Sequence, residues 1–249
     1  MNKILWFDIF SQSRLTIGRQ CRLSCLECPI AEACGILSEP EDFAKLIQAG
    51  KTDEIIPPGK IIHLIGGDPL RYPDLPILLH TLWTYSKWVR LWTPGVISYE
   101  QWDVISPYIS EVYLYCPAVT PSTYRAITGW DRFEELRDVI VFMKESKTNL
   151  TLQFPVTLES VQWLPEVHEF AKSMGTRLLI HYNHLLPFHK DTIAYIERYR
   201  LVPDVDVIAF RNRKRGFCDI PFAEHWAGWE KISFIAQELR NRLNRIFPI

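Results

Sequence analysis

Three cysteines lie close together near the start of the chain, at Cys21, Cys25 and Cys28, with the spacing C-x3-C-x2-C. Thiolates presented by one short loop are ligands for iron and for zinc. Three of them can hold three irons of a four-iron cluster and leave the fourth iron open to a further ligand. A structural zinc site would need a fourth ligand, and a chance grouping of thiols is the remaining interpretation. We therefore expect an iron–sulfur site, with zinc as the alternative.

A second motif that could do chemistry is Gly66-Gly67-Asp68-Pro69, which follows the apolar residues 60–65. Two glycines let a backbone approach a ligand closely, and a carboxylate accepts hydrogen bonds from an ammonium group. The same residues are also typical of a plain turn between a strand and a helix, in which Asp68 lies at the helix start. Both interpretations stay open on the motif alone.

The composition bounds the class of protein. The chain has 249 residues, of which 47% are hydrophobic and 23% charged, so one domain with a sizeable core is expected. The formal net charge of -1 excludes a general polyanion binder, and the short basic run at 211–215 is interpreted as a solvated turn. We expect no nucleic-acid partner.

The location is inferred from the cysteines and from missing targeting signals. Residues 1–8 contain an acid and lack a small-residue cleavage site, so they do not resemble a secretory signal. No apolar segment reaches the length of a membrane span. Six cysteines without an export signal are expected in a reducing cytoplasm, as metal ligands or thiols rather than disulfides.

These motifs are carried by alternating strand and helix patterns. Apolar β-rich runs predict strands at 14–17, 60–65, 88–92, 111–115, 150–154 and 177–181. Between them, amphipathic patterns predict helices at 40–48, 75–85, 99–108, 131–146 and 164–174. Repeated β-α steps imply a parallel sheet with right-handed crossovers. Six steps are too few for an eight-stranded barrel, so we predict an α/β fold with a partial (β/α)6 barrel.

In such a fold the reactive groups gather where the strands end, at their carboxyl ends. The cysteine loop and the glycine motif meet that condition. So do several other residues at or just beyond the ends of predicted strands, namely Thr93, Cys116, Gln153, Thr157, His181, Asn183 and His184. A lone histidine or a buried thiol at such a place is more often structural, so those roles stay open.

The predicted domain division places the partial barrel at residues 1–202 and a C-terminal extension at 203–249. The extension is expected to contain a strand at 205–210 and a helix at 229–246, packed on the barrel.

With the two motifs together, the sequence resembles the radical SAM enzymes, over roughly residues 13 to 185. A third match, residues 123–129 followed by 133–143, is similar to the family branch with cyclic-pyranopterin synthases and peptide-modifying enzymes. Two departures stand out: Asp68 replaces the usual Glu, and Tyr115-Cys116-Pro117-Ala118 replaces a Ser-x-Asp-Gly-like turn.

The resemblance implies that Cys21, Cys25 and Cys28 hold one [4Fe-4S] cluster, whose unique iron is chelated by S-adenosylmethionine. It also implies cofactor contacts by Gly66, Gly67, Asp68, Pro69, Glu27, Thr93, Gln153, Thr157, His181 and Asn183. Glu27 stands where the family usually has an aromatic residue, so its backbone is the expected contact to the adenine. A reductant such as flavodoxin or ferredoxin would supply electrons, and a peptide or small biosynthetic intermediate would be the substrate.

Three cysteines outside the triplet have no assigned role: Cys34, Cys116 and Cys218. We interpret Cys116 as a candidate catalytic residue facing the pocket, with a small buried thiol as the alternative. A radical methyltransferase that carries a methyl group on Cys116 or Cys218 is a second enzyme hypothesis. A non-catalytic zinc or iron–sulfur scaffold, or an electron carrier, is the hypothesis from another class.

Overall fold

The structure is a computed structural model of the chain, and it describes residues 12–17, 21, 23, 47–51, 56, 59–183 and 189–210. Several predictions fall outside these residues: most of the helix at 40–48, the helix at 229–246, and any role of Glu27, Cys25, Cys28, His184, Cys34 or Cys218.

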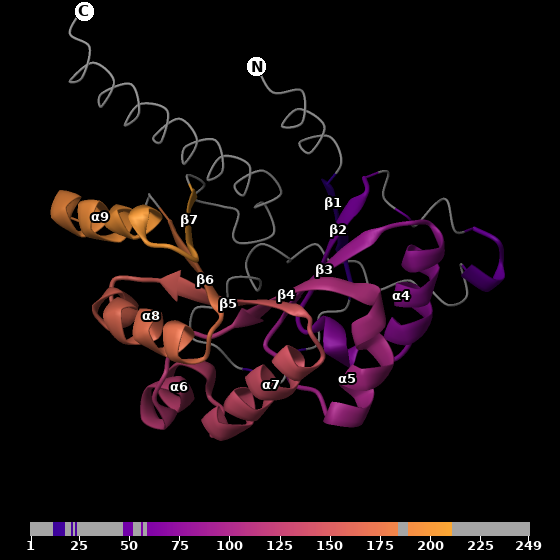
Figure 1. Cartoon of the computed structure of the whole chain (residues 1–249), viewed down its shortest axis with the longest axis horizontal. Coiled ribbons are helices and arrows are strands. Elements are labelled where there is room, and N and C mark those ends of the chain that lie inside the picture. The colour runs from indigo at the N-terminus through magenta and orange to yellow at the C-terminus, as the bar shows by residue number, and fades with distance from the viewer. Residues whose placement is uncertain are drawn as a thin grey trace, which may run out of the picture.

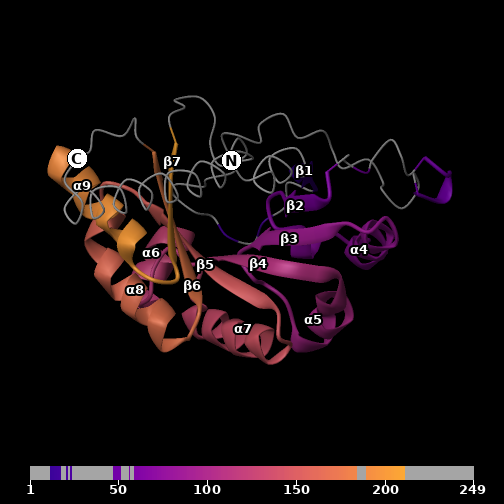
Figure 2. The same cartoon turned by 45° about the horizontal axis from the view of Figure 1, so that its top comes forward.

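Seven parallel strands form one sheet, and their order in the sheet is their order in the chain. The strands are β1 (Gln12–Thr16), β2 (Ile61–Ile65), β3 (Trp88–Thr93), β4 (Ile109–Tyr115), β5 (Asn149–Val156), β6 (Arg177–Asn183) and β7 (Val205–Phe210). Each strand pairs in parallel with the next one along the chain, and the sheet curves, as Figures 1 and 2 show.

Helices occupy the connections from β2 onward. They are α4 (Leu75–Thr84), α5 (Tyr99–Ile105), α6 (Pro121–Thr128), α7 (Phe133–Glu145), α8 (Leu164–Ser173) and α9 (Lys190–Glu197). Short 3-10 turns stand at Pro69–Arg71 (η1), Ser106–Tyr108 (η2), Ser160–Trp163 (η3) and Arg198–Leu201 (η4). Helices α4 to α8 lie along the outer side of the curved sheet (Figure 2).

The spacing of apolar residues explains why these helices lie where they do. Helix α7 buries the five residues that its 3.6-residue period places on one side, Phe133, Leu136, Val139, Ile140 and Met143. The predicted helix at 99–108 ends early, at Ile105, because Pro107 follows and the chain continues as η2. Helices α6 and α9 were not predicted from the sequence.

The two faces of the sheet differ in composition. Since side chains alternate along a strand and parallel neighbours are in register, the odd-numbered residues of β4, β5 and β6 share one face. The other face carries the aliphatic residues that pack under the helices, among them Leu64, Leu91, Leu114, Leu152 and Ile180. We call the first the inner face and the second the helix-covered face.

The predicted fold class is confirmed: the chain is an α/β protein with a parallel sheet of partial-barrel type. The strand expected at 205–210 is present as β7, and it pairs with β6 as the last strand of the same sheet. The division into domains at residue 202 stays a prediction, because most of the proposed extension lies outside the described residues.

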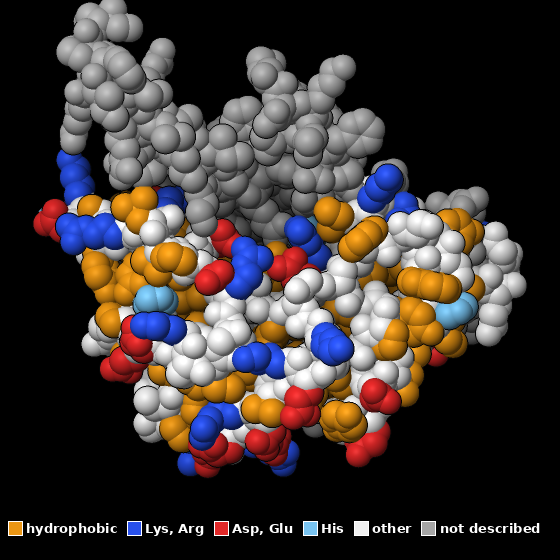
Figure 3. Space-filling view, viewed as in Figure 1, with side chains coloured by type: hydrophobic (Ala, Val, Ile, Leu, Met, Phe, Trp, Pro, Cys, Tyr) orange, Lys and Arg blue, Asp and Glu red, His pale blue; other side chains and the backbone are white. Residues whose placement is uncertain are grey.

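Among the described residues, each helix is too short or too polar to pass through a bilayer. On the face drawn in Figure 3, basic and acidic side chains are interspersed rather than separated by sign.

Candidate functional site

The two sequence motifs follow neighbouring strands at the carboxyl end of the sheet. Strands β1 and β2 are paired in parallel, and the pairing continues to Ile17, whose N–H donates to the carbonyl of Ile65 at 2.8 Å. Cys21 follows Ile17 by four residues, and Gly66 follows Ile65 directly. The cysteine loop and the glycine motif therefore leave adjacent strands at the same edge.

Cys21 is the one member of the cysteine triplet that the described residues include. Its thiol is partly exposed, and its Sγ accepts a hydrogen bond from the N–H of Leu23 at 3.4 Å. Backbone N–H groups directed at a sulfur stabilise its thiolate form, which is the form that binds metal. This environment suits a metal ligand.

The glycine motif turns into the short η1 helix. Asp68 is its N-cap: the backbone is extended there, and Oδ1 accepts from the N–H of Leu70 at 3.2 Å. The Asp68 residue is only 2% exposed, and Gly66 and Pro69 are also buried. The turn that the sequence left open as an alternative is therefore present. Contact of this carboxylate with a cofactor stays a prediction.

Thr93, the last residue of β3, is in direct contact with Asp68. Its hydroxyl donates to Asp68 Oδ1 at 2.7 Å and accepts from the N–H of Gly95 at 3.0 Å. Both Thr93 and Asp68 are buried. The structure thus joins two residues that the sequence placed at the ends of different strands.

Gln153 and His181 form a second pair at the same end of the sheet. They lie on the inner face of β5 and β6, and their Nε2 atoms are 3.0 Å apart within a hydrogen bond. Burial lowers the pKa of His181 to about 3, so its imidazole is neutral at ordinary pH. The pair offers a neutral, buried hydrogen-bonding group.

Two further predicted contacts have less support. The hydroxyl of Thr157 accepts from the N–H of Ser160 at 3.0 Å and donates to Glu159 at 3.0 Å, so it serves the turn after β5. Asn183 is the last residue of β6, and only its backbone lies within the described part of the chain. Cofactor contacts by Thr157 and Asn183 stay predictions.

Cys116 does not lie where a catalytic role would place it. It is fully buried within the aliphatic cluster of the helix-covered face, and its Sγ is 3.5 Å from the carbonyl oxygen of Ala118. Burial raises the pKa of this thiol to about 12, which suppresses the thiolate. The geometry fits a small buried thiol and gives no support to catalysis.

The inner face also holds aromatic residues that the sequence analysis did not single out. Trp92 stacks on Tyr113 with ring centroids 4.0 Å apart, and its Nε1–H donates to Nδ1 of His63 at 3.0 Å. All three are buried and come from β2, β3 and β4. Their signal in the sequence was the alternation of polar or aromatic residues with aliphatic ones along each strand.

A charged network lies deeper on the same face, toward the amino ends of the strands. Glu111 accepts from Nε of Arg90 at 3.0 Å, and Nη1 of Arg177 lies 3.6 Å from its other oxygen. Arg177 in turn pairs with Asp206 on β7. This network ties four strands together below the aromatic pair.

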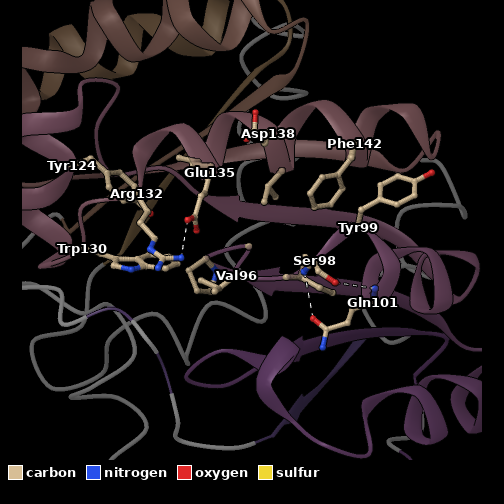
Figure 4. Close-up of a pocket in the computed structure, with 15 residues that line it drawn as sticks. Val96, Ser98, Tyr99, Gln101, Tyr124, Trp130, Arg132, Glu135, Asp138 and Phe142 are labelled. Carbon is tan, nitrogen blue, oxygen red and sulfur yellow. Dashed lines mark hydrogen bonds and ion pairs between the residues drawn. The ribbon is translucent and has the colours of Figure 1, made fainter.

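A cavity of about 440 Å³ lies elsewhere, between the loop after β3 and helices α5 and α7 (Figure 4). Arg132 lies over the ring of Trp130 at 5.6 Å and forms an ion pair with Glu135 at 2.7 Å. None of the predicted site residues lines this cavity. This cavity is therefore not part of the candidate site at the carboxyl end of the sheet.

The comparisons with known proteins point one way. No family model and no curated protein matches the chain. Solved structures do match: Streptococcus suis SuiB bound to S-adenosylmethionine has a TM-score of 0.60 at 14% identity, covering 81% of this chain and 47% of SuiB. SuiB bound to the precursor peptide SuiA matches with a TM-score of 0.59, at 14% identity over 81% of this chain and 49% of SuiB.

A further match is anSMEcpe with bound AdoMet, with a TM-score of 0.55 at 14% identity, covering 76% of this chain and 61% of anSMEcpe. The chain spans about half of the length of SuiB. SuiB and anSMEcpe are radical SAM enzymes. At this level of identity the likeness concerns the fold alone. The chain therefore has the fold of the radical SAM enzymes.

Proposed function

We propose that this chain is a radical SAM enzyme with one [4Fe-4S] cluster, held by Cys21, Cys25 and Cys28. The observation that carries the proposal is that Cys21 and the Gly66–Pro69 turn follow neighbouring parallel strands, within a fold shared with radical SAM enzymes. Neither motif is specific alone, but together they supply sulfur ligands and a buried carboxylate at one rim.

The residues that are present fit such a group. The Cys21 sulfur is a ligand stabilised by a backbone N–H, and Asp68 is a carboxylate that could receive the ammonium group of S-adenosylmethionine. When bound, the cluster would supply one-electron reduction of S-adenosylmethionine, whose C5′–S bond would break to give methionine and a 5′-deoxyadenosyl radical able to take a hydrogen atom from a substrate. The protein's part is to bind, orient and exclude water.

The inner face carries residues that suit binding a substrate and excluding water. Its aromatic pair and the Gln153–His181 pair are buried and carry no formal charge, because burial keeps His181 neutral. A neutral lining neither attracts water strongly nor donates protons readily. The Glu111 network lies nearer the amino ends of the strands. The charged groups described on the inner face are therefore away from the carboxyl end of the sheet.

For the substrate, we propose a peptide. SuiB is matched in a structure with its precursor peptide SuiA, and anSMEcpe in a structure with the Kp18Cys peptide at a TM-score of 0.53. These neighbours favour a peptide over the small biosynthetic intermediate that the sequence also allowed. An external reductant would be needed to reduce the cluster.

The test is anaerobic reconstitution with iron and sulfide, followed by an assay for 5′-deoxyadenosine with and without dithionite. We expect about four irons per chain, absorption near 400 nm, and 5′-deoxyadenosine only with reductant. Cys25→Ala should lose both the cluster and the cleavage. Cys116→Ala is the matched control, because it also removes a thiol but in the aliphatic core.

Two results would contradict the proposal. One is a Cys25→Ala protein that keeps its colour and its cleavage activity. The other is one zinc per chain with no absorption near 400 nm, which would support the scaffold hypothesis instead. A methyl group found by mass spectrometry on Cys218 would redirect the proposal to a methyltransferase; the burial of Cys116 argues against that thiol as a carrier.

A further inference from the structure

The contact between Thr93 and Asp68 carries an inference beyond the superfamily. The hydroxyl of Thr93 lies 2.7 Å from Asp68 Oδ1, and the N–H of Gly95 donates to the same hydroxyl oxygen at 3.0 Å. An ionised carboxylate can only accept hydrogen bonds, so the hydroxyl of Thr93 donates to Asp68 while it accepts from the N–H of Gly95. The direction of this hydrogen bond is thus set by the chemistry of its two partners.

The surroundings make this bond strong and rigid. Thr93 is 3% exposed and Asp68 is 2% exposed, so water competes poorly for either group. A hydroxyl that donates to a carboxylate forms a charge-assisted hydrogen bond, stronger than one between neutral groups. Thr93 is also β-branched, so its side chain has few rotamers in a strand. The second donor to Oδ1 is the N–H of Leu70 in η1.

The loop that aims the hydroxyl is itself held by the core. Gly95 has a φ of +81°, which favours glycine, and a Cβ at this position would overlap the side chain of Leu114 on β4. The backbone at Gly95 therefore packs closely against Leu114. A chain of contacts leads from Leu114 through Gly95 and Thr93 to the Asp68 carboxylate.

We propose that Thr93 is a positioning residue, whose hydroxyl orients the Asp68 carboxylate toward the ammonium group of S-adenosylmethionine. This inference rests on the proposed function. It also revises the role expected for Thr93: its hydroxyl is used by Asp68 and Gly95 rather than by the cofactor. Thr93 acts on binding through Asp68.

The test compares three variants of the reconstituted protein. Thr93→Val keeps the shape of the side chain and removes the hydroxyl, whereas Thr93→Ser keeps the hydroxyl. Thr128→Val is the matched control: Thr128 is also buried, donates from its hydroxyl at 2.7 Å to the Tyr124 carbonyl, and accepts from the N–H two residues on at 3.2 Å. Its partners lie in α6 and the turn after it.

Affinity for S-adenosylmethionine is measured by equilibrium dialysis, beside iron content and the KM and kcat for 5′-deoxyadenosine. Thr93→Val should bind about 10-fold more weakly, as expected for a lost charge-assisted hydrogen bond, with wild-type iron content and a rise in KM larger than the fall in kcat. Thr93→Ser and Thr128→Val should stay within about twofold of wild type.

A second readout needs no cofactor. Denaturation midpoints of the protein without cluster are compared for Thr93→Val, Asp68→Ala and the double variant. We expect the two single shifts to be non-additive, because each removes the same hydrogen bond. Additive shifts would show that the two side chains are not coupled and would overturn the inference.

The outcomes separate the two proposals. If the wild type binds no S-adenosylmethionine, the proposed function fails and this role of Thr93 fails with it. If the wild type binds and Thr93→Val binds equally well, only the positioning role is overturned. If Thr93→Ser is as weak as Thr93→Val, the side chain acts by packing of its methyl group, and the inference is again overturned.

Discussion

The two faces of the sheet use neighbouring residues for opposite purposes. On β5, Leu152 packs into the aliphatic core while Gln153 hydrogen-bonds His181 on the inner face. On β4, Leu114 and Tyr113 divide in the same way between the core and the stack with Trp92. The helix-covered face stabilises the fold, and the inner face holds groups that can meet a ligand. Burial alone therefore does not distinguish a core residue from a site residue.

The largest loss of stability is expected from a substitution on the helix-covered face. Leu152→Ala removes a fully buried side chain and should destabilise the protein by about 3 kcal/mol, through lost burial and the cavity left behind. The free energy of unfolding from urea titration measures it. Gln153→Ala, one residue along on the inner face, is the comparison and should cost clearly less. Equal losses would break the distinction between the two faces.

The next largest loss of stability tests whether the charged network stabilises the contacts between the strands on the inner face. Glu111→Gln removes the charge that Arg90 and Arg177 share, and it should cost about 1–3 kcal/mol, reduced by the partial exposure of both arginines. Urea denaturation at low salt and at 1 M salt measures it, and the gap between wild type and variant should shrink in high salt. A gap that is absent at low salt would mean that the network adds no stability.

A pH experiment tests the buried imidazole of His181. Burial lowers its pKa from 6.5 to about 3, so below pH 6.5 the unfolded chain binds a proton that the folded chain does not. The stability due to this residue is therefore complete above pH 6.5 and falls as the pH falls. Between pH 7.5 and pH 5.5 the loss should be about 1.4 kcal/mol.

His181→Gln keeps a hydrogen-bonding side chain beside Gln153 but cannot titrate. Its unfolding free energy should fall less than that of the wild type over the same pH interval. Parallel pH dependences for the two proteins would show that His181 is not held neutral by the fold.

The smallest loss of stability is expected from the substitution of Cys116 on the helix-covered face. Because burial raises its pKa to about 12, iodoacetamide at pH 8 should leave Cys116 unmodified in the folded protein and label it in urea. Cys116→Ala should cost about 1 kcal/mol or less. Peptide mapping by mass spectrometry reads the labelling, and rapid labelling of the folded protein would reopen a catalytic role for this thiol.

Much of the architecture was predictable because it depends on local patterns. The six strands and the amphipathic helix α7 were read from apolar periodicity, and the five residues predicted on the buried face of α7 are the ones it buries. Helix α6 was missed because it is short and polar and is fixed by its caps: the Thr120 side chain at its start and Gly129 in the left-handed conformation at its end.

The candidate site was only partly predictable. The sequence marked Asp68 and Thr93 as ends of strands, but their hydrogen bond depends on which strands become neighbours and where each of them ends. It also named Cys116 as facing a pocket. Because side chains alternate between the two faces along a strand, a shift of one residue moves a side chain to the other face. The thiol of Cys116 lies on the side of the core.

By itself, the sequence determined the chemical groups, their order along the chain and the periodicity that makes strands and helices. Cysteine spacing and the Gly66–Pro69 motif are properties of contiguous residues, so no folding information was needed to see them. Only the tertiary structure decided which of these groups meet, since contacts such as Thr93 with Asp68 and Gln153 with His181 join residues 25 and 28 positions apart. Such pairs form through strand register and curvature, which depend on the packing of the whole sheet.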